Sequence, residues 1–181
     1  MAEEAKKAEL SIEEVLASTS IADVYQAAKQ LDGVAAKTHL IESPYFSDLC
    51  GNNVYLKPEN LQNTGSFKLR GAYNKISQLN EDERKRGVIT ASAGNHAQGV
   101  AFAARALNCK AVICMPATTP ILKVEATRAY GAEVVLYGDS FDDAYAKSLE
   151  LQKKKGYVYI HPFNDQKVLA GQGTTALEII D

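Results

Sequence analysis

Apolar positions in the second half of the chain occur as short continuous runs separated by longer stretches with helical spacing. The short runs predict strands at residues 88–91, 111–115, 133–137 and 157–160. The longer stretches predict helices at residues 66–79, 95–107, 120–130, 140–155 and 166–180. Strands joined through helices of this length form right-handed crossovers. We therefore expect an α/β fold with an open, mostly parallel sheet.

Polar residues at the ends of these segments support the predicted boundaries. Residues 80–87 open with a capping asparagine and acidic residues and close with basic residues and glycine, which predicts a short helix. Pro120 falls in the first turn of its predicted helix, and Gly131 stops the same helix.

The N-terminal third has weaker patterning. Ser11 and Glu14 match a capping box, which predicts that a helix begins there. A second helix is predicted at residues 21–31. Residues 53–57 predict a short strand that ends at Pro58.

Composition narrows the class of protein. The chain has 181 residues, of which 46% are hydrophobic and 23% charged, as in ordinary soluble globular proteins. A formal net charge of -2 argues against nucleic acid as a partner, because phosphate binding needs a basic surface. No apolar run reaches the length of a membrane span, so we expect no membrane partner.

The cysteines indicate a reducing compartment. Three cysteines cannot all pair with one another, and they lie among apolar residues, so we expect the cytoplasm. They form no metal-ligand spacing with the histidines, which argues against a zinc site; the residues concerned are Cys50, Cys109, Cys114, His39, His96 and His161.

Lys68 is the first candidate for chemistry. It lies beside Phe67 in the first turn of a predicted helix, after the turn residues 64–66. A helix N-terminus and apolar neighbours both lower the pKa of an amine, which makes a lysine nucleophilic. The alternative is a solvated surface lysine, the usual case on an amphipathic helix, and the pattern alone leaves both open.

The loop at residues 92–96 is the second candidate. It follows an apolar strand and precedes a helix, which is where parallel sheets bind ligands. Gly94 allows close approach of a ligand to the backbone, and Ser92 and Asn95 add polar side chains. The alternative is a helix N-cap with no ligand.

Two further features have structural interpretations. Residues 171–176 match G-x-G-x-x-A, but no buried strand directly precedes them and no acidic residue follows at the required distance, so we reject a dinucleotide site and expect a tight turn that starts a helix. His161 follows the last predicted strand, where a structural role is favoured over a place in a cleft.

Taken together, these motifs resemble those of the fold-type II pyridoxal-phosphate enzymes, and among them most closely the threonine dehydratases (threonine ammonia-lyases). The resemblance covers residues 21–181. It rests on several motifs in the family's order, namely KPENLQ at 57–62, GSFKLRGA at 65–72, SAGNHAQG at 92–99, PATTP at 116–120 and GQGT at 171–174.

The resemblance implies roles for individual residues. Lys68 would hold pyridoxal 5'-phosphate as a Schiff base and, once released, remove the α-proton of the substrate. Phe67 would position the cofactor ring, and Asn95 would hydrogen-bond its hydroxyl. The loop that would hold the substrate carboxylate consists of Ser92, Ala93, Gly94, Asn95 and His96.

The implied reaction is the deamination of L-threonine to 2-oxobutanoate and ammonia, or of L-serine to pyruvate, with a place in isoleucine biosynthesis and a homo-oligomeric full-length form. Serine racemases of the family have a serine where this chain has Ala93, which disfavours racemisation. Two alternatives stay open: a non-catalytic α/β fragment or binding domain, and another β-eliminase of the same fold, such as a serine dehydratase or a cysteine-synthase-like enzyme.

The resemblance also implies an incomplete domain. Relatives continue further and carry a glycine-rich loop for the cofactor phosphate. We expect residues 1–63 to begin the large cofactor domain, residues 64–160 to form the small α/β domain, and residues 161–181 to return to the large one. Segments 21–61 and 166–181 should then expose apolar faces, and the chain alone should have little or no activity.

Overall fold

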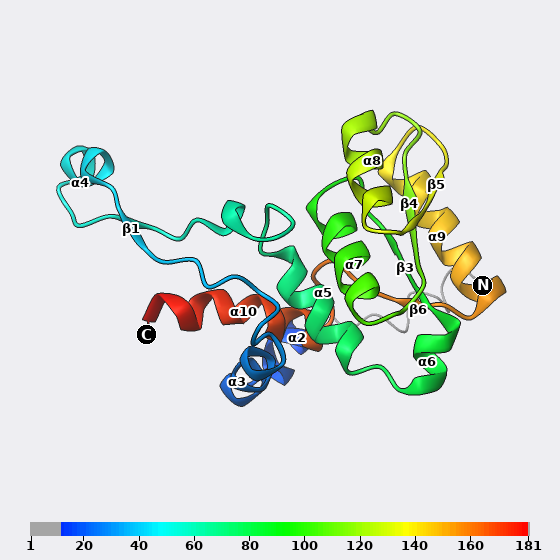
Figure 1. Ribbon diagram of the computed structural model, residues 1–181, viewed down its shortest axis with the longest axis horizontal. Helices are drawn as coiled ribbons and strands as arrows, with labels where there is room; N and C mark the ends of the chain where they lie inside the picture. The colour runs from blue at the N-terminus through cyan, green and yellow to red at the C-terminus, as the bar shows by residue number, and fades with distance from the viewer. Residues whose placement is uncertain (1–11, 181) are drawn as a thin grey trace.

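The computed structural model describes residues 12–180, which form a parallel α/β unit with a projecting arm (Figure 1). The sheet has the strand order β5-β4-β3-β6, and every neighbouring pair is parallel. Its strands are β3 (Val88–Ala91), β4 (Ala111–Met115), β5 (Glu133–Leu136) and β6 (Val158–Tyr159). The α/β class and the parallel sheet predicted from the sequence are therefore confirmed.

The chain changes direction once within this sheet. It adds β4 and then β5 on one side of β3, through α7 (Asn95–Ala106) and α8 (Ile121–Ala129). It then crosses back through α9 (Phe141–Lys155) and places β6 on the other side of β3. Since right-handed crossovers in opposite directions lie on opposite faces, α7 and α8 cover one face and α9 covers the other (Figure 1).

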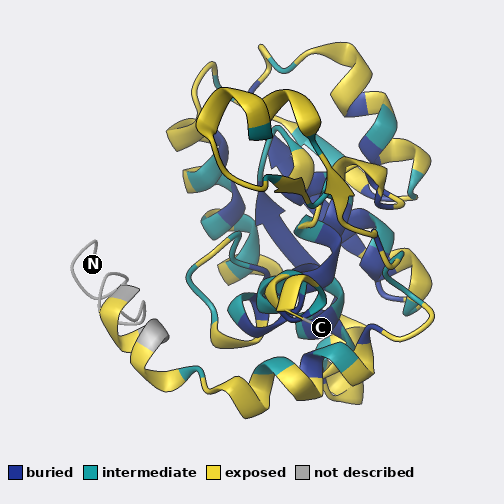
Figure 2. Ribbon diagram, turned by 90° about the vertical axis from the view of Figure 1, so that its left-hand side faces the viewer, coloured by how far each residue is buried: buried dark blue, intermediate teal, exposed yellow. Residues whose placement is uncertain are grey.

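Alternate residues of the central strands β3 and β4 fill two cores, so these two strands are buried on both faces (Figure 2). Toward α7 and α8 lie Val88, Ile113 and Met115, with Val100 and Val124 from the helices. Toward α9 lie Ile89, Ala91, Val112 and Cys114, with Ala144.

Helix α5 (Lys68–Ser77) is packed between α7 and α10 (Gln166–Ile180). A Cβ atom on Gly71 would lie 2.7 Å from the Val168 carbonyl oxygen, and one on Gly171 would lie 2.6 Å from the Arg70 carbonyl oxygen. Glycine therefore lets the two helices touch through their backbones. The tight turn expected at residues 171–176 was wrong, because these residues lie inside α10.

The two-sided packing buries more of α5 than a single apolar stripe. Phe67, at the N-cap, is 40% exposed. The buried residues of the helix include Leu69, Ile76 and the polar residue Asn74. A helix held between two others buries a wider surface than an amphipathic stripe indicates.

The arm consists of β1 (Ile41–Glu42), α4 (Pro44–Cys50) and β2 (Tyr55–Leu56), with β1 and β2 antiparallel (Figure 1). The predicted strand at 53–57 is thus confirmed in shorter form. Helix α4 was not predicted, although Ser43 caps it, Pro44 occupies its first turn and Gly51 ends it at φ 67°.

Both segments expected to expose apolar side chains do so, although Leu122, at 81% exposed, lies outside them. On the arm, Tyr45 is 72% exposed and Leu49 is 70% exposed; on α10, Ile180 is 73% exposed. Within residues 12–180, no helix combines the length and apolar character needed to cross a membrane.

Helices α2 (Ile12–Ser18), α3 (Ile21–Gln30) and α6 (Glu81–Arg86) lie close to their predicted positions. The short 3-10 helix at Glu59–Leu61 was not predicted. Asn80 and Glu83 form a capping box that starts α6. The capping box predicted at the start of α2 needs Ser11, which lies outside the described residues.

A buried ion cluster joins the base of the arm, α5 and α10. Arg70 is 1% exposed, and its guanidinium lies 2.9 Å from the Glu59 carboxylate and 2.6 Å from the Glu178 carboxylate. Lys57 also pairs with Glu178, so two cations face two anions. Burial alone would raise the pKa of Glu59 and Glu178, but the hydrogen bonds from Arg70 and the other polar neighbours, together with the nearby positive charge, outweigh it and lower the pKa of both carboxyls. The cluster is therefore stable only when it is complete.

We predict that Arg70→Met lowers the free energy of unfolding by about 2–4 kcal/mol, because it leaves two carboxylates largely buried without their partner. Arg128→Met is the matched control, since Arg128 pairs with Glu125 on an exposed helix face and should contribute about 0.5 kcal/mol or less. Urea unfolding measures both variants. Equal losses would contradict the special role of the Arg70 cluster.

Candidate functional site

Two loops meet where the chain changes direction in the sheet. Residues 92–94 leave the carboxyl end of β3, and residues 160–162 leave the carboxyl end of the adjacent strand β6. In open α/β sheets ligands bind at this point, because crossovers on opposite faces leave a crevice there. Strand order thus selects this edge independently of any motif.

The first loop leads into an uncapped helix. The Ser92 amide donates to the Cys114 carbonyl at 3.1 Å, and the Gly94 amide donates to the Ser92 hydroxyl at 3.3 Å. Gly94 itself occupies the N-cap position of α7, where no side chain caps the helix. The N-cap interpretation of Ser92 and Asn95 is therefore not what the structure has, and the first turn of α7 offers amides suited to an anion.

This loop is also accessible. Asn95 is exposed, and residues 92–94 are half-buried. A Cβ atom added to Gly94 would meet nothing within 4 Å, so there is open space beside the backbone. A ligand can approach the amides of the loop from that side.

Lys68 begins α5 and points to the second loop. Its backbone amide donates to the Ser66 hydroxyl at 3.2 Å, and its Nζ donates to the Pro162 carbonyl at 2.9 Å. Its Nζ also lies 5.4 Å from the centre of the Phe67 ring. Lys68 is half-buried with its Nζ on the Pro162 carbonyl, so it is not a fully solvated surface residue, and burial lowers the pKa of its amine below the ordinary value.

Gly99 lets α7, which follows the first loop, pack closely against the backbone at Lys68. A Cβ atom on Gly99 would lie 2.9 Å from the carbonyl carbon of Lys68 and 3.0 Å from the amide nitrogen of Leu69. The absence of a side chain lets α7 touch the backbone at the start of α5. The uncapped end of one helix and the lysine of the other are therefore fixed relative to each other.

His96 lies beneath these groups and is 3% exposed. Its Nε2 is 3.0 Å from the carbonyl oxygen of Ile160, and because a carbonyl only accepts, Nε2 carries the proton. Burial lowers the pKa of His96 to about 4; the Ile160 hydrogen bond opposes this, and the nearby charge of Lys68 adds to it.

His161 has a structural role, as the sequence indicated. Its Nδ1 accepts hydrogen bonds from the amides of Asn164 at 2.7 Å and Phe163 at 3.3 Å, which closes the turn after β6. The sequence analysis did not identify Ile160 and Pro162, which act through backbone carbonyls. Such groups occur in every residue, so the sequence carries no signal for them.

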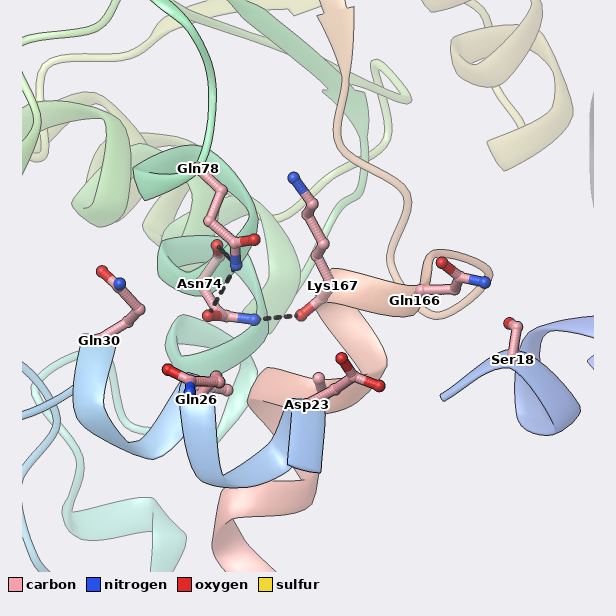
Figure 3. A pocket seen from close by; sticks show the side chains of 10 residues that line it. Ser18, Asp23, Gln26, Gln30, Asn74, Gln78, Gln166 and Lys167 are labelled. Atoms are coloured by element: carbon pink, nitrogen blue, oxygen red, sulfur yellow. Dashed lines mark hydrogen bonds between the residues drawn. The ribbon is translucent and has the colours of Figure 1, made fainter. Parts of the chain in front are cut away.

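A cavity elsewhere in the structure is not lined by the candidate residues. It has a volume of about 360 Å³ and lies between α3, α5 and α10 (Figure 3). Its lining is mainly side-chain amides, and two of them, Asn74 and Gln78, are already hydrogen-bonded to one another. None of the candidate residues in the two loops or at Lys68 lines it.

Comparisons with known proteins agree on one family. A family model described as "Pyridoxal-phosphate dependent enzyme" matches residues 31–181. The chain is 52% identical over 162 residues to the L-threonine ammonia-lyase of Thermotoga maritima, covering 90% of this chain and 40% of that protein.

Solved structures share the fold. The processed form of threonine deaminase isoform 2 from Solanum lycopersicum matches with a TM-score of 0.84 and 47% identity, covering 94% of this chain and 46% of that one. Maize serine racemase matches with a TM-score of 0.87 and 32% identity, covering 90% and 50%. The chain thus spans half or less of the length of these relatives.

We predict that Gly99→Ala forces α7 away from Lys68 and lowers the free energy of unfolding by about 1–3 kcal/mol, as overpacking does. Gly94→Ala is the matched control, because its methyl group enters open space and should cost about 1 kcal/mol or less. Urea unfolding and amide chemical shifts of residues 66–72 measure the effect. Shifts of equal size in the two variants would show that the contact is not close.

Proposed function

Because this chain belongs to the pyridoxal-phosphate dependent enzymes, we propose that it forms the lysine-bearing part of an enzyme that deaminates L-threonine, and also L-serine. The products are 2-oxobutanoate or pyruvate, with ammonia. The observation that carries the proposal is the partly desolvated amine of Lys68, held at the same sheet edge as the uncapped N-terminus of α7.

The residues at this edge fit the cofactor. An aldehyde requires an unprotonated amine, and burial moves Lys68 in that direction. The ring of Phe67 lies beside this amine and is 40% exposed, so it can contact a flat aromatic ring. Asn95 is exposed at the start of α7, where its amide can reach a ring hydroxyl.

When bound, the cofactor withdraws electrons from the substrate α-carbon. Lys68 would hold the cofactor through its Nζ, and the same amine, when free, would accept the α-proton of the substrate. The Pro162 carbonyl accepts one N–H of this amine and so orients its lone pair. We assign binding of the substrate carboxylate to the amides of residues 92–96, which start α7 without a side-chain cap.

Ala93 favours deamination over racemisation. Racemisation needs a second proton carrier on the opposite side of the α-carbon, and the methyl group of Ala93 has no exchangeable proton. The likeness to maize serine racemase is a likeness of fold, which hosts both reactions. The names of the relatives from Thermotoga maritima and Solanum lycopersicum support threonine as the substrate.

Three further points stay predictions from the sequence. They are the division at residues 63/64 and 160/161 into parts of a large and a small domain, the homo-oligomeric state of the full-length form, and the cytoplasmic location.

We predict that the chain mixed with pyridoxal phosphate and reduced with borohydride carries the pyridoxyl group on Lys68. The partly desolvated amine of Lys68 is the group best suited to bind the aldehyde. Peptide mass spectrometry locates the label. Lys68→Met should lose the label, whereas Lys75→Met, seven residues further along α5 at the Asp165 ion pair, should keep it.

Labels scattered over exposed lysines, with none preferred, would contradict the proposal. A second assay measures 2-oxobutanoate formed from L-threonine. We expect any such activity to disappear in Lys68→Met, and activity that survives this substitution would exclude Lys68 as the base.

A further inference from the structure

His96 is a buried imidazole that uses only one of its two nitrogens. Nε2 donates to the Ile160 carbonyl at 3.0 Å, while Nδ1 is buried without a hydrogen-bond partner. An apolar side chain of similar volume would fill the same space without the unpaired Nδ1, but it would leave the buried Ile160 carbonyl without this donor. Filling of the core therefore does not account for a histidine at this position, and the Nε2 contact is what distinguishes it.

The acceptor of this hydrogen bond lies on a segment that also contacts Lys68. Ile160 is fully buried, and its amide donates to the Ile89 carbonyl at 2.9 Å, which continues the β6–β3 pairing. Its carbonyl is held by His96 on α7. Two residues later, the Pro162 carbonyl receives the Lys68 amine at 2.9 Å.

The imidazole thus connects two parts of the candidate site that are distant in the sequence. One is the start of α7, beside the loop assigned to the substrate carboxylate. The other is the segment 160–162, which orients the lysine amine. Because Nε2 is already used by Ile160, the His96 side chain does not have this donor available for a substrate.

We propose that His96 is a positioning residue: as the neutral Nε2–H tautomer, it holds the segment 160–162 in place, so that the Pro162 carbonyl orients the Lys68 amine. The catalytic use of the Lys68 amine rests on the proposed function, whereas the hydrogen bonds of His96 and Lys68 do not depend on it. The titratable groups that act on the ring through their charge are Lys68 and His161, and a neutral imidazole avoids placing a second positive charge near Lys68.

Two amide substitutions separate this role from simple packing. The side-chain nitrogen of glutamine can occupy the place of Nε2 and keep the donor, whereas that of asparagine corresponds to Nδ1 and cannot reach Ile160. We therefore compare His96→Gln with His96→Asn in the 181-residue chain, without cofactor.

The readout is the pKa of the Lys68 amine, followed by ¹³C NMR of labelled lysine ε-carbons and assigned with Lys68→Arg. In the unsubstituted chain it should lie below the ordinary value of 10.5. In His96→Asn the segment 160–162 is released and water reaches the amine, so the pKa should move up toward that value. His96→Gln should keep it low.

Three results would overturn the proposal. They are an unchanged Lys68 pKa in His96→Asn, an equal upward shift in His96→Gln, or ¹⁵N ring shifts that place the proton of His96 on Nδ1. The ¹⁵N spectrum of the ring is recorded on the unsubstituted chain, so it tests the tautomer of His96 even if a variant does not fold. Failure of Lys68 to bind pyridoxal phosphate would contradict the proposed function alone, because this titration uses no cofactor.

Discussion

Arg70 is buried with its charge balanced by Glu59 and Glu178, and this balance lets the first turns of α5 lie inside the protein. Helix ends usually face water because their amides lack partners. Here the cluster binds α5 to α10 and to the base of the arm, while glycine contacts bring α10 and α7 against its backbone. Lys68 is therefore the first residue of a helix that is held on both sides.

This packing makes the lysine reactive at a cost in stability. An amine that is partly removed from water favours its neutral form, which is the form that attacks an aldehyde or accepts a proton. The buried Nδ1 of His96 is a second unfavourable feature at the same place. Both lie at the edge of the sheet where the chain changes direction, whereas the two cores below contain mainly apolar side chains. Locally unfavourable features of this kind, such as a partly buried amine or an unpaired buried nitrogen, are typical of functional sites.

The sequence predicted the strands and long helices because their periodicity records which faces are buried. It also identified Lys68 and the loop at 92–96. It did not predict the position of β6 beside β3, since strand order depends on contacts between distant segments. Nor did it predict the burial of Arg70, because arginine is usually exposed and its partner Glu178 is 108 residues away. The carbonyls of Ile160 and Pro162 had no signal, and Gly171 was assigned to a turn because helix-to-helix contact is a tertiary property.

The central claim is that the start of α5 is fixed before any cofactor binds. Native-state hydrogen exchange tests it most directly, at the amides of Arg70, which donates to Phe67, and Gly71, which donates to the Gln172 side chain. If the start of α5 is fixed in this way, both amides exchange only when the whole protein unfolds, with a free energy equal to that from urea unfolding. Exchange through local fraying at much lower free energy, as at an ordinary helix N-terminus, would contradict it.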